Sequence, residues 1–305
     1  MANLLPISIV MATANRSTIL ANTLRSVGQQ IHQPQEIIII DGSIDEKTFL
    51  LLKEPIHGLS SQVLYQRAVE LGAAKQRNQG IQKATCDVIG FMDDDILLEP
   101  DCILNLWNAL QHSKDAGGVN ALITNQHYTT PRFITRLFYQ AMMGKRANDF
   151  AGKVFGPVVN LLPADDQSLG DVVPVEWLNT TCTLYKKDQL PDPVFDRHFE
   201  GYSLMEDLVL SLRVAQTSRL YNVRTARIFH DTQPGVQKNN VQVMSEMDLV
   251  NRYYVMRKVM KQKGLMPYLK LIIHQLYFAV ATRNIYKPAF LKGKFNGTKQ
   301  ILKST

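Results

Sequence analysis

The stretch from Asp87 to Pro100 reads DVIGFMDDDILLEP, and it decides both the fold and the chemistry that we expect. Val88 to Met92 is a short apolar run with β-branched and aromatic members, which is typical of a buried strand. Asp93 to Asp95 follow immediately. We expect a helix directly after them, because Pro100 suits a first helical turn. The apolar residues beyond it recur at helical spacing: Ile103, Leu104, Trp107 and Leu110.

Three carboxylates at the end of a buried strand repel one another unless a cation lies among them. Hard oxygen ligands favour Mg²⁺ or Mn²⁺, and Mg²⁺ commonly binds through one or two carboxylates together with substrate phosphates. The alternative is an acidic surface turn, because turns are rich in aspartate.

The composition indicates an ordinary globular protein. The 305 residues are 45% hydrophobic and 20% charged, enough for one large domain or for one domain with an appendage. Cys86, Cys102 and Cys182 are odd in number and lack CxxC spacing, so neither a disulfide framework nor a zinc site is indicated. The first residues contain no basic segment of a secretory signal, and no apolar run reaches the length of a membrane span. We therefore expect a cytoplasmic location.

The N-terminal part alternates strands and helices. The mainly apolar segment Ile7–Met11, the segment Glu36–Ile40 with its four consecutive isoleucines, and the shorter run Val63–Tyr65 predict strands, with helices between them. This order describes an open α/β sheet, whose ligands lie outside the carboxyl ends of the strands. Thr13 and Asp41 fall there, together with the aspartate cluster.

Four segments in this order, IVMATANR, IIIIDGS, GAAKQRNQGI and FMDDD, resemble the nucleotide-sugar half of glycosyltransferase family 2, across roughly residues 5 to 235. The resemblance implies the GT-A fold, a Rossmann-like, mostly parallel central sheet flanked by helices. It also implies a set of residues that bind the nucleotide sugar: Thr13, Arg16, Asp41, Arg77, Asp93 and Asp94. Asp93 and Asp95 are the implied metal ligands, for Mn²⁺ or Mg²⁺.

Two of these residues fit their implied roles chemically. Asp41 can accept a hydrogen bond from a pyrimidine imide N–H, and the guanidinium of Arg77 suits phosphate oxygens. The alternative for Arg77 is an ordinary exposed helical arginine. Ala12 and Ala14 stand where the family usually has proline and an aromatic residue, which leaves the identity of the base open.

A second group of acids lies in residues 195–213, FDRHFEGYSLMEDLVLSLR. Glu206 and Asp207 precede a helical pattern, and they could simply stabilise the positive end of that helix. The segment also resembles the acceptor-site motif of the family, which implies that Asp207 is the catalytic base. Glu206 is then expected to orient the acceptor or to cap the helix.

His230 in RIFHD is the remaining candidate ligand. A lone histidine is more often an ordinary core or surface residue. However, some members of the family complete their metal site with a histidine at this point in the order, and neutral imidazole can bind Mn²⁺. The resemblance thus implies a site formed by Asp93, Asp95 and His230.

Positive charge is concentrated at the C-terminus. Residues 213–305 hold 17 Lys and Arg against 3 Asp and Glu, whereas residues 1–212 hold 17 against 24. From residue 242 onward we expect basic helices that either pack on the core or contact an anionic membrane or a lipid-linked acceptor. The protein could therefore lie peripherally at the inner face of the membrane.

We predict a GT-A catalytic domain over residues 1–240, with a nucleotide-sugar half (1–118) and an acceptor half (119–240), and a basic helical extension over 241–305. The predicted enzyme is a metal-dependent, inverting glycosyltransferase that uses a UDP or dTDP sugar to build a polysaccharide or glycoconjugate. Its expected partners are the donor and a saccharide or lipid-linked saccharide acceptor, without nucleic acid. Two alternatives remain: a sugar-1-phosphate nucleotidyltransferase, and a non-catalytic protein that binds polysaccharide or nucleic acid.

Overall fold

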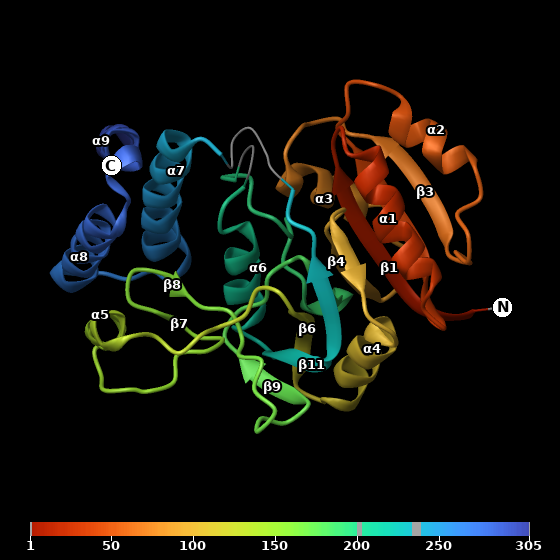
Figure 1. Ribbon diagram of the computed structural model, residues 1–305, viewed down its shortest axis with the longest axis horizontal. Coiled ribbons are helices and arrows are strands. Elements are labelled where there is room, and N and C mark those ends of the chain that lie inside the picture. The colour runs from red at the N-terminus through yellow and green to blue at the C-terminus, as the bar shows by residue number, and fades with distance from the viewer. Residues whose placement is uncertain (1, 200–202, 234–238, 305) are drawn as a thin grey trace. The chain divides into compact units, whose positions relative to one another are not determined.

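The computed structural model describes residues 2–199, 203–233 and 239–304 (Figure 1). It divides into two compact units. The first consists of Met1–Tyr128 and Leu162–Gln233, and the second of Thr129–Leu161 and Pro234–Thr305. Residues 129–161 thus belong to the same unit as the C-terminal helices. The expected division after residue 240 instead placed them with the rest of the N-terminal part. The functional boundaries of the domains stay a prediction.

The first unit is built on one sheet. Within the described residues its strands are β1 (Asn3–Thr13), β2 (His32–Asp41), β3 (Gln62–Arg67), β4 (Val88–Met92), β5 (Ile96–Leu98), β6 (Ala116–Ile123), β9 (Val172–Val175), β10 (Cys182–Lys186) and β11 (Arg219–His230). The order is β3-β2-β1-β4-β10-β6-β11-β5, with β9 paired to β11. β1 to β4 are mutually parallel, as are β6 and β11, while β10 runs antiparallel to its neighbours β4 and β6. This mixed, mostly parallel sheet confirms the predicted fold class.

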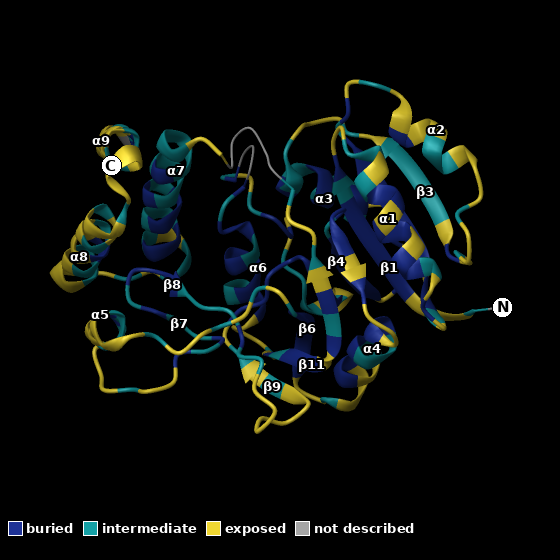
Figure 2. Ribbon diagram, in the orientation of Figure 1, coloured by how far each residue is buried: buried dark blue, intermediate teal, exposed yellow. Residues whose placement is uncertain are grey.

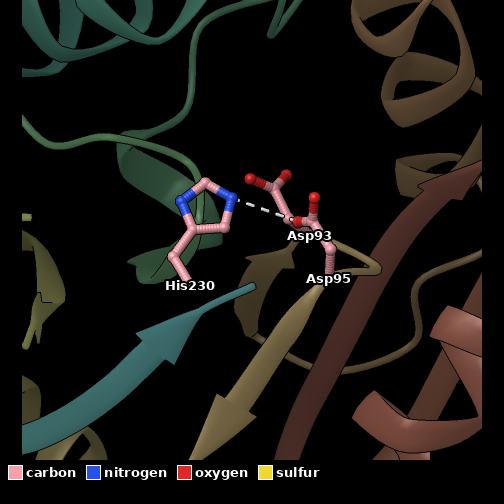
Figure 3. Close-up of side chains that lie close together, drawn as sticks. All are labelled: Asp93, Asp95 and His230. Atoms are coloured by element: carbon pink, nitrogen blue, oxygen red, sulfur yellow. Dashed lines mark hydrogen bonds and ion pairs between the residues drawn. The ribbon is translucent and has the colours of Figure 1, made fainter. Parts of the chain in front are cut away.

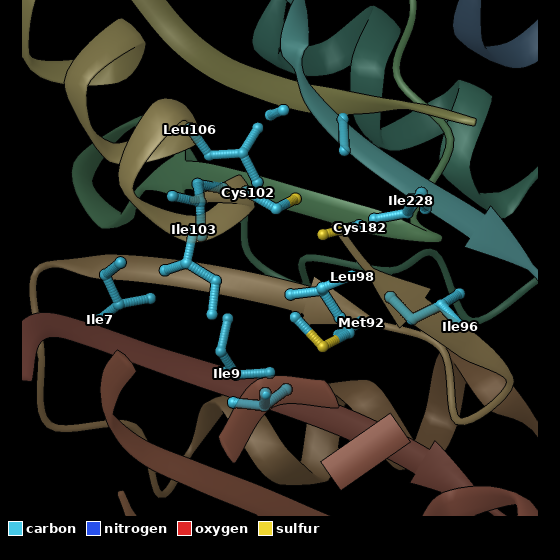
Figure 4. Packing of buried hydrophobic residues seen from close by; sticks show 14 of the residues in the cluster. Ile7, Ile9, Met92, Ile96, Leu98, Cys102, Ile103, Leu106, Cys182 and Ile228 are labelled. Carbon is cyan, nitrogen blue, oxygen red and sulfur yellow. The ribbon is translucent and has the colours of Figure 1, made fainter. Parts of the chain in front are cut away.

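Helices cover both faces of this sheet. They are α1 (Ser17–Gly28), α2 (Lys47–Lys53), α3 (Ala73–Ile81), α4 (Cys102–His112) and α6 (Glu206–Val214). The main hydrophobic core contains apolar residues of α1 and α4 together with Ile7, Ile9 and Ile37 of the strands. Figure 4 shows Ile7 and Ile9 in this core with Ile103 and Leu106 of α4. Alternate strand residues face the other side, where α3 lies against Val10 and Ile40. Burial on both faces explains the continuous isoleucine run in β2.

One expectation for the central stretch was wrong. The helix does not follow the aspartates directly, because the short strand β5 comes first and α4 begins only at Cys102. β5 pairs antiparallel with the end of β11. The pairing holds the aspartate turn beside the last residues of β11, and it joins residues 96–98 to residues 228–230, which are far apart in the sequence.

The second unit is mainly helical. Its described elements are α5 (Phe133–Met143), the small hairpin β7 (Val154–Phe155) and β8 (Val159–Asn160), α7 (Val241–Tyr254), a π-helical turn (Val255–Val259), α8 (Leu265–Ala281), a short 3₁₀ turn (Asn284–Tyr286) and α9 (Lys287–Ser304). Asp248 of α7 accepts hydrogen bonds from Arg252 and from Lys294 of α9. Gly293 lets α9 approach α7, because a Cβ there would lie 2.2 Å from the carbonyl oxygen of Gln242. Among the described helices, none is both long and apolar enough to cross a membrane.

Candidate active site

The aspartate turn and the end of β11 bring three potential metal ligands together. β4 ends at Met92, so Asp93 and Asp95 lie in the turn that leads into β5, and Ile96 of β5 pairs with His230. His230 Nε2 lies 3.1 Å from Asp95 Oδ1 (Figure 3). The backbone N–H of Asp231 donates to the carbonyl oxygen of Asp95 at 2.8 Å, which fixes the two segments against each other.

Asp93, Asp95 and His230 fit a divalent cation. Each offers one ligand atom, and these atoms all lie within 4.8 Å of one another. Metal–ligand distances of roughly 2.0–2.6 Å allow ligands on opposite sides of an ion to be about 4–5 Å apart, so the spacing suits Mn²⁺ or Mg²⁺. Although burial raises the pKa of Asp95, the contacts with His230, the backbone N–H of Gln233 and the charge of Arg16 together lower that pKa below its usual value. Asp95 is thus held as a carboxylate, the form that binds metal.

Asp94 is oriented differently from its two neighbours. Its side chain is buried, and it accepts hydrogen bonds from Thr13 Oγ1 at 2.6 Å and from Arg16 Nη1 at 3.1 Å. Thr23 of α1 holds its backbone carbonyl oxygen at 2.8 Å. Burial raises the pKa of Asp94 to about 6. Asp94 therefore positions the loop after β1, and the roles of Thr13, Arg16 and Asp94 toward a nucleotide stay predictions.

Arg77 joins the two acidic groups of the site. It is buried, and its two terminal nitrogens donate to different carboxylates: Nη2 to Asp93 Oδ1 at 2.6 Å, and Nη1 to Glu206 Oε1. These carboxylates raise the pKa of Arg77 even though burial opposes them. The alternative of an exposed helical arginine is excluded. Both ends of the fork that was expected to meet phosphate are engaged, so the role of Arg77 toward the nucleotide stays a prediction.

Glu206 and Asp207 form the first turn of α6. Met205, which precedes them, has a left-handed backbone (φ +76°), a conformation that costs about 1–3 kcal/mol in non-glycine residues and is often found at functional sites. Asp207 is half-buried and its Oδ1 accepts from the backbone N–H of Leu208 at 2.7 Å. Burial raises the pKa of Glu206 to about 7 and that of Asp207 to about 6. Both groups can therefore exchange protons near neutral pH.

Asp41 lies in a separate polar pocket at the end of β2. It is buried, and its Oδ1 accepts from the backbone N–H of Ser43 at 2.8 Å and from the hydroxyl of the same residue. Its Oδ2 accepts from Tyr65 Oη at 3.1 Å and from Arg67 Nη1 at 3.4 Å. The sequence reasoning missed these three partners. Tyr65 and Arg67 are two positions apart at the carboxyl end of β3, so their side chains lie on the same face of the sheet. This end of a strand is where an open α/β sheet places ligand contacts.

The metal cluster and the acids of α6 leave a surplus of negative charge. The site holds five carboxylates, those of Asp93, Asp94, Asp95, Glu206 and Asp207. Arg16 forms ion pairs with Asp94 and Asp95, and Arg77 forms ion pairs with Asp93 and Glu206. Buried or partly buried carboxylates without a counter-charge are costly. The arrangement therefore favours a bound cation.

Comparison with known proteins gives a consistent result. Residues 8–159 match the model of the family described as Glycosyl transferase family 2. The Glucosyl-dolichyl phosphate glucuronosyltransferase of Haloferax volcanii is 28% identical over 137 residues, 44% of this chain and 43% of that protein. The Poly-beta-1,6-N-acetyl-D-glucosamine synthase of Staphylococcus aureus is 29% identical over 153 residues, 48% of this chain and 36% of that protein. The chain thus spans less than half the length of these relatives.

Solved structures share the fold over nearly the whole chain. The mannosyltransferase PcManGT of Pyrobaculum calidifontis, in complex with GDP-Man and Mn²⁺, has a TM-score of 0.56 at 13% identity and covers 98% of this chain and 76% of that one. Residues 1–349 of S. aureus TarS, in complex with UDP-GlcNAc, have a TM-score of 0.54 at 14% identity and cover 94% of this chain and 79% of that one. At these identities the likeness concerns the fold. The family assignment comes from the matched segment: the chain carries a glycosyl transferase family 2 domain that includes residues 8–159.

Proposed function

We propose that this chain is a metal-dependent, inverting glycosyltransferase that moves a sugar from a nucleoside-diphosphate sugar to an acceptor hydroxyl. One observation carries the proposal: the potential metal ligands Asp93, Asp95 and His230 are connected to the acids of α6 through a single arginine. Arg77 forms ion pairs with both Asp93 and Glu206, and Asp207 is the next residue after Glu206. Such a site has one part suited to a diphosphate and another suited to removing a proton. PcManGT and TarS, which share the fold, are complexed with GDP-Man and UDP-GlcNAc, and this supports a nucleotide-sugar donor.

In the proposed reaction Asp207 is the general base. Its carboxylate takes the proton as the acceptor O–H bond breaks, and the oxygen forms a bond to the anomeric carbon. The bond from that carbon to the diphosphate breaks, and its electron pair leaves with the diphosphate. A pKa of about 6 suits this role, because a base with a pKa near the working pH is both deprotonated and strong enough. A divalent ion at Asp93, Asp95 and His230, when bound, would neutralise the charge of the leaving diphosphate.

The other residues act by position. Arg77 pairs with both Asp93 and Glu206, and these ion pairs fix the distance between the proposed donor site and the proposed acceptor site. Asp41, with Ser43, Tyr65 and Arg67, is proposed to bind the base. A pyrimidine imide N–H can donate a hydrogen bond to a carboxylate, so we favour UDP or dTDP. The names of the two curated relatives support an acceptor in polysaccharide or glycoconjugate synthesis.

The test is a panel of UDP, dTDP and GDP sugars with Mn²⁺ or with a chelator. We expect one donor to stabilise the protein in thermal unfolding and to release nucleoside diphosphate only with the metal. A donor at a hundred times its dissociation constant adds about 2.7 kcal/mol. Early-time proton NMR should show the released sugar with inverted anomeric configuration. Retained configuration, or formation of a nucleotide sugar from a sugar phosphate and a nucleoside triphosphate, would contradict the proposal. No turnover with any donor would favour a non-catalytic role.

A further inference from the structure

Helix α8 of the second unit has an exposed side that is entirely apolar. Its outward residues recur every three or four positions, and two of them, Leu265 and Val280, are 82% and 80% exposed. The set is Leu265, Leu269, Ile272, Leu276 and Val280, with Met266 and Ile273 beside it. A helix on the surface of a water-soluble domain normally turns such a stripe inward and its polar residues outward.

Polar side chains of α8 and the ring of Tyr277 contact the rest of the unit instead. Tyr277 stacks on Phe138 of α5 with ring centroids 4.0 Å apart, and its hydroxyl lies 3.0 Å from Thr135 Oγ1. Lys270 Nζ donates to the carbonyl oxygen of Met142 at 2.7 Å. His274 is buried, and burial lowers its pKa to about 3, so it is neutral in the folded unit. The orientation of α8 is therefore fixed by specific inward contacts.

These contacts also place α5 antiparallel to α8, because Thr135 meets Tyr277 whereas Met142 meets Lys270. In a helix the residue before a contact residue is rotated by about 100° around the axis. For two antiparallel helices that pack side by side, these rotations turn the preceding residues toward the same side. Ile134 and Leu137 of α5 precede contact residues and are 73% and 47% exposed.

The exposed residues of the two helices therefore form one continuous surface, which we call the apolar face: Ile134, Leu137, Leu265, Leu269, Ile272, Leu276 and Val280. Figure 2 shows the exposed colouring along α8 and on α5. An exposed apolar surface of this kind marks an interaction site.

The charge around the apolar face indicates what covers it. The chain has no Asp or Glu from residue 249 to 305, where it has 12 Lys and Arg, and residues 129–146 have four Lys and Arg and no acid. Exposed Lys261 and Lys263 precede α8, and exposed Arg283 follows it. An apolar surface with a basic rim complements the anionic surface of a lipid bilayer, which attracts both parts at once.

We propose that the apolar face of α5 and α8 docks in the interface of an anionic lipid bilayer, with the basic side chains at the level of the headgroups. The apolar side chains enter the boundary between headgroups and acyl chains, as in other interfacial helices. Each Lys or Arg near the surface adds roughly a fivefold gain in partitioning, so the attraction depends on salt and on lipid charge.

The test is flotation of the full chain with vesicles of phosphatidylcholine, with or without about one third phosphatidylglycerol. We expect the protein to float with the anionic vesicles at low salt and to be released at high salt. The double variant Leu269→Gln, Leu276→Gln should lower the partition coefficient by roughly tenfold or more, because two apolar side chains no longer favour the lipid. Ile134→Gln with Leu137→Gln should lower it as well if both helices share the face.

The control is Leu4→Gln with Ile31→Gln in the first unit. Leu4 and Ile31 are 48% and 63% exposed, which matches Leu269 and Leu276 at 45% and 61%. This control should bind vesicles like the unmodified chain. Release of nucleoside diphosphate from a soluble donor should be the same in all variants. Flotation therefore tests membrane docking, and nucleotide release tests the proposed reaction separately. Absent flotation, unchanged flotation of the α8 variant, or a dimer that the α8 variant converts to monomer would overturn the proposal.

Discussion

Arg77 is the residue that best shows the limit of prediction from sequence. Its place on α3 and its resemblance to the family motif led us to expect a phosphate contact. The structure instead pairs it with Asp93 and with Glu206, which is 129 positions away in the sequence. A spacing of that length has no local signal. The aspartate cluster and Glu206-Asp207 could each be identified, because each is a run of acids beside a strongly apolar element.

The proposed base is tested by Asp207→Asn, which keeps the shape of the side chain and removes its basicity. Positioned proton transfer contributes roughly a hundred- to ten-thousand-fold to the rate, so we expect turnover to fall by that factor. Affinity for the nucleotide should stay within a few-fold, since we propose that Asp207 acts on the acceptor and not on the nucleotide. Steady-state kinetics and calorimetry on the same variant separate these effects.

Glu206→Gln is the matched comparison. It should be the milder change, because Arg77 keeps its bond to Asp93 and the amide can still accept from Arg77. Near-normal transfer in Asp207→Asn together with an inactive Glu206→Gln would reverse the two roles.

The raised pKa of Asp207 predicts the pH dependence of transfer. A general base must be deprotonated, so the rate should rise with pH, reach half its maximum near pH 6 and level off above it. The folded protein binds this proton more tightly than the unfolded chain. The contribution of Asp207 to the free energy of unfolding therefore falls as the pH rises from the ordinary pKa of an aspartate, 3.8, to the raised pKa of about 6. A rate that falls over this range at saturating donor and metal would exclude Asp207 as the base.

His230→Gln tests the proposed third metal ligand while both carboxylate ligands, Asp93 and Asp95, are kept. We expect weaker Mn²⁺ binding, by roughly tenfold or more, because an amide oxygen replaces an imidazole nitrogen. Pulsed electron paramagnetic resonance of bound Mn²⁺ should show a nitrogen coupling in the unmodified protein and lose it in the variant. Equal nitrogen coupling in both proteins would remove His230 from the site.

Among the elements, α3 packs closely on the sheet because Gly80 has no side chain. A Cβ at Gly80 would lie 2.4 Å from Val10 Cγ1 and 3.2 Å from Ile40 Cγ1, so any larger residue pushes α3 off the sheet. We expect Gly80→Ala to lower the free energy of unfolding by about 1–3 kcal/mol, even though alanine favours a helix. It should also reduce transfer, because α3 carries Arg77.

Gly170→Ala is the control for this substitution, since the nearest atom to a Cβ there is 4.0 Å away. Chemical denaturation compares the two variants. Equal stability of Gly80→Ala and Gly170→Ala would show that the packing of α3 against β1 and β2 does not depend on this glycine.

Elements with strong periodicity could be predicted, and short elements that depend on distant partners could not. β1, β2 and β4 were expected because continuous apolar runs need burial on both faces. β5 has three residues and exists through its pairing with β11, so the turn after the aspartates gave no sign of it. The packing side of α5 is not evident from its sequence, because apolar residues lie on both its exposed and its buried sides. Phe133 and Leu137 are exposed, whereas Phe138 and Met142 are buried against the second unit's own helices.

For the whole molecule, the order of strands and helices was enough to predict a mostly parallel α/β sheet, and the family match agrees with it. The division into two compact units could not be predicted from the sequence. Residues 129–161 precede β9 to β11 in the chain, yet they pack with the C-terminal helices through contacts such as Arg252 with the carbonyl oxygen of Val158. The basic excess of the C-terminal part was evident from counting charges, but the outward apolar face of α8 required the structure.

The central claim is that Asp93, Asp95 and His230 hold a divalent ion on the diphosphate of the donor. Calorimetric titration with UDP, in Mn²⁺ and in chelator, on the unmodified protein and on Asp95→Ala, tests it most directly. We predict that UDP binds measurably only with Mn²⁺ and that Asp95→Ala abolishes this metal-dependent binding, because carboxylates without a cation repel a diphosphate. Undiminished Mn²⁺-dependent affinity in Asp95→Ala, or equal affinity in chelator, would contradict the claim.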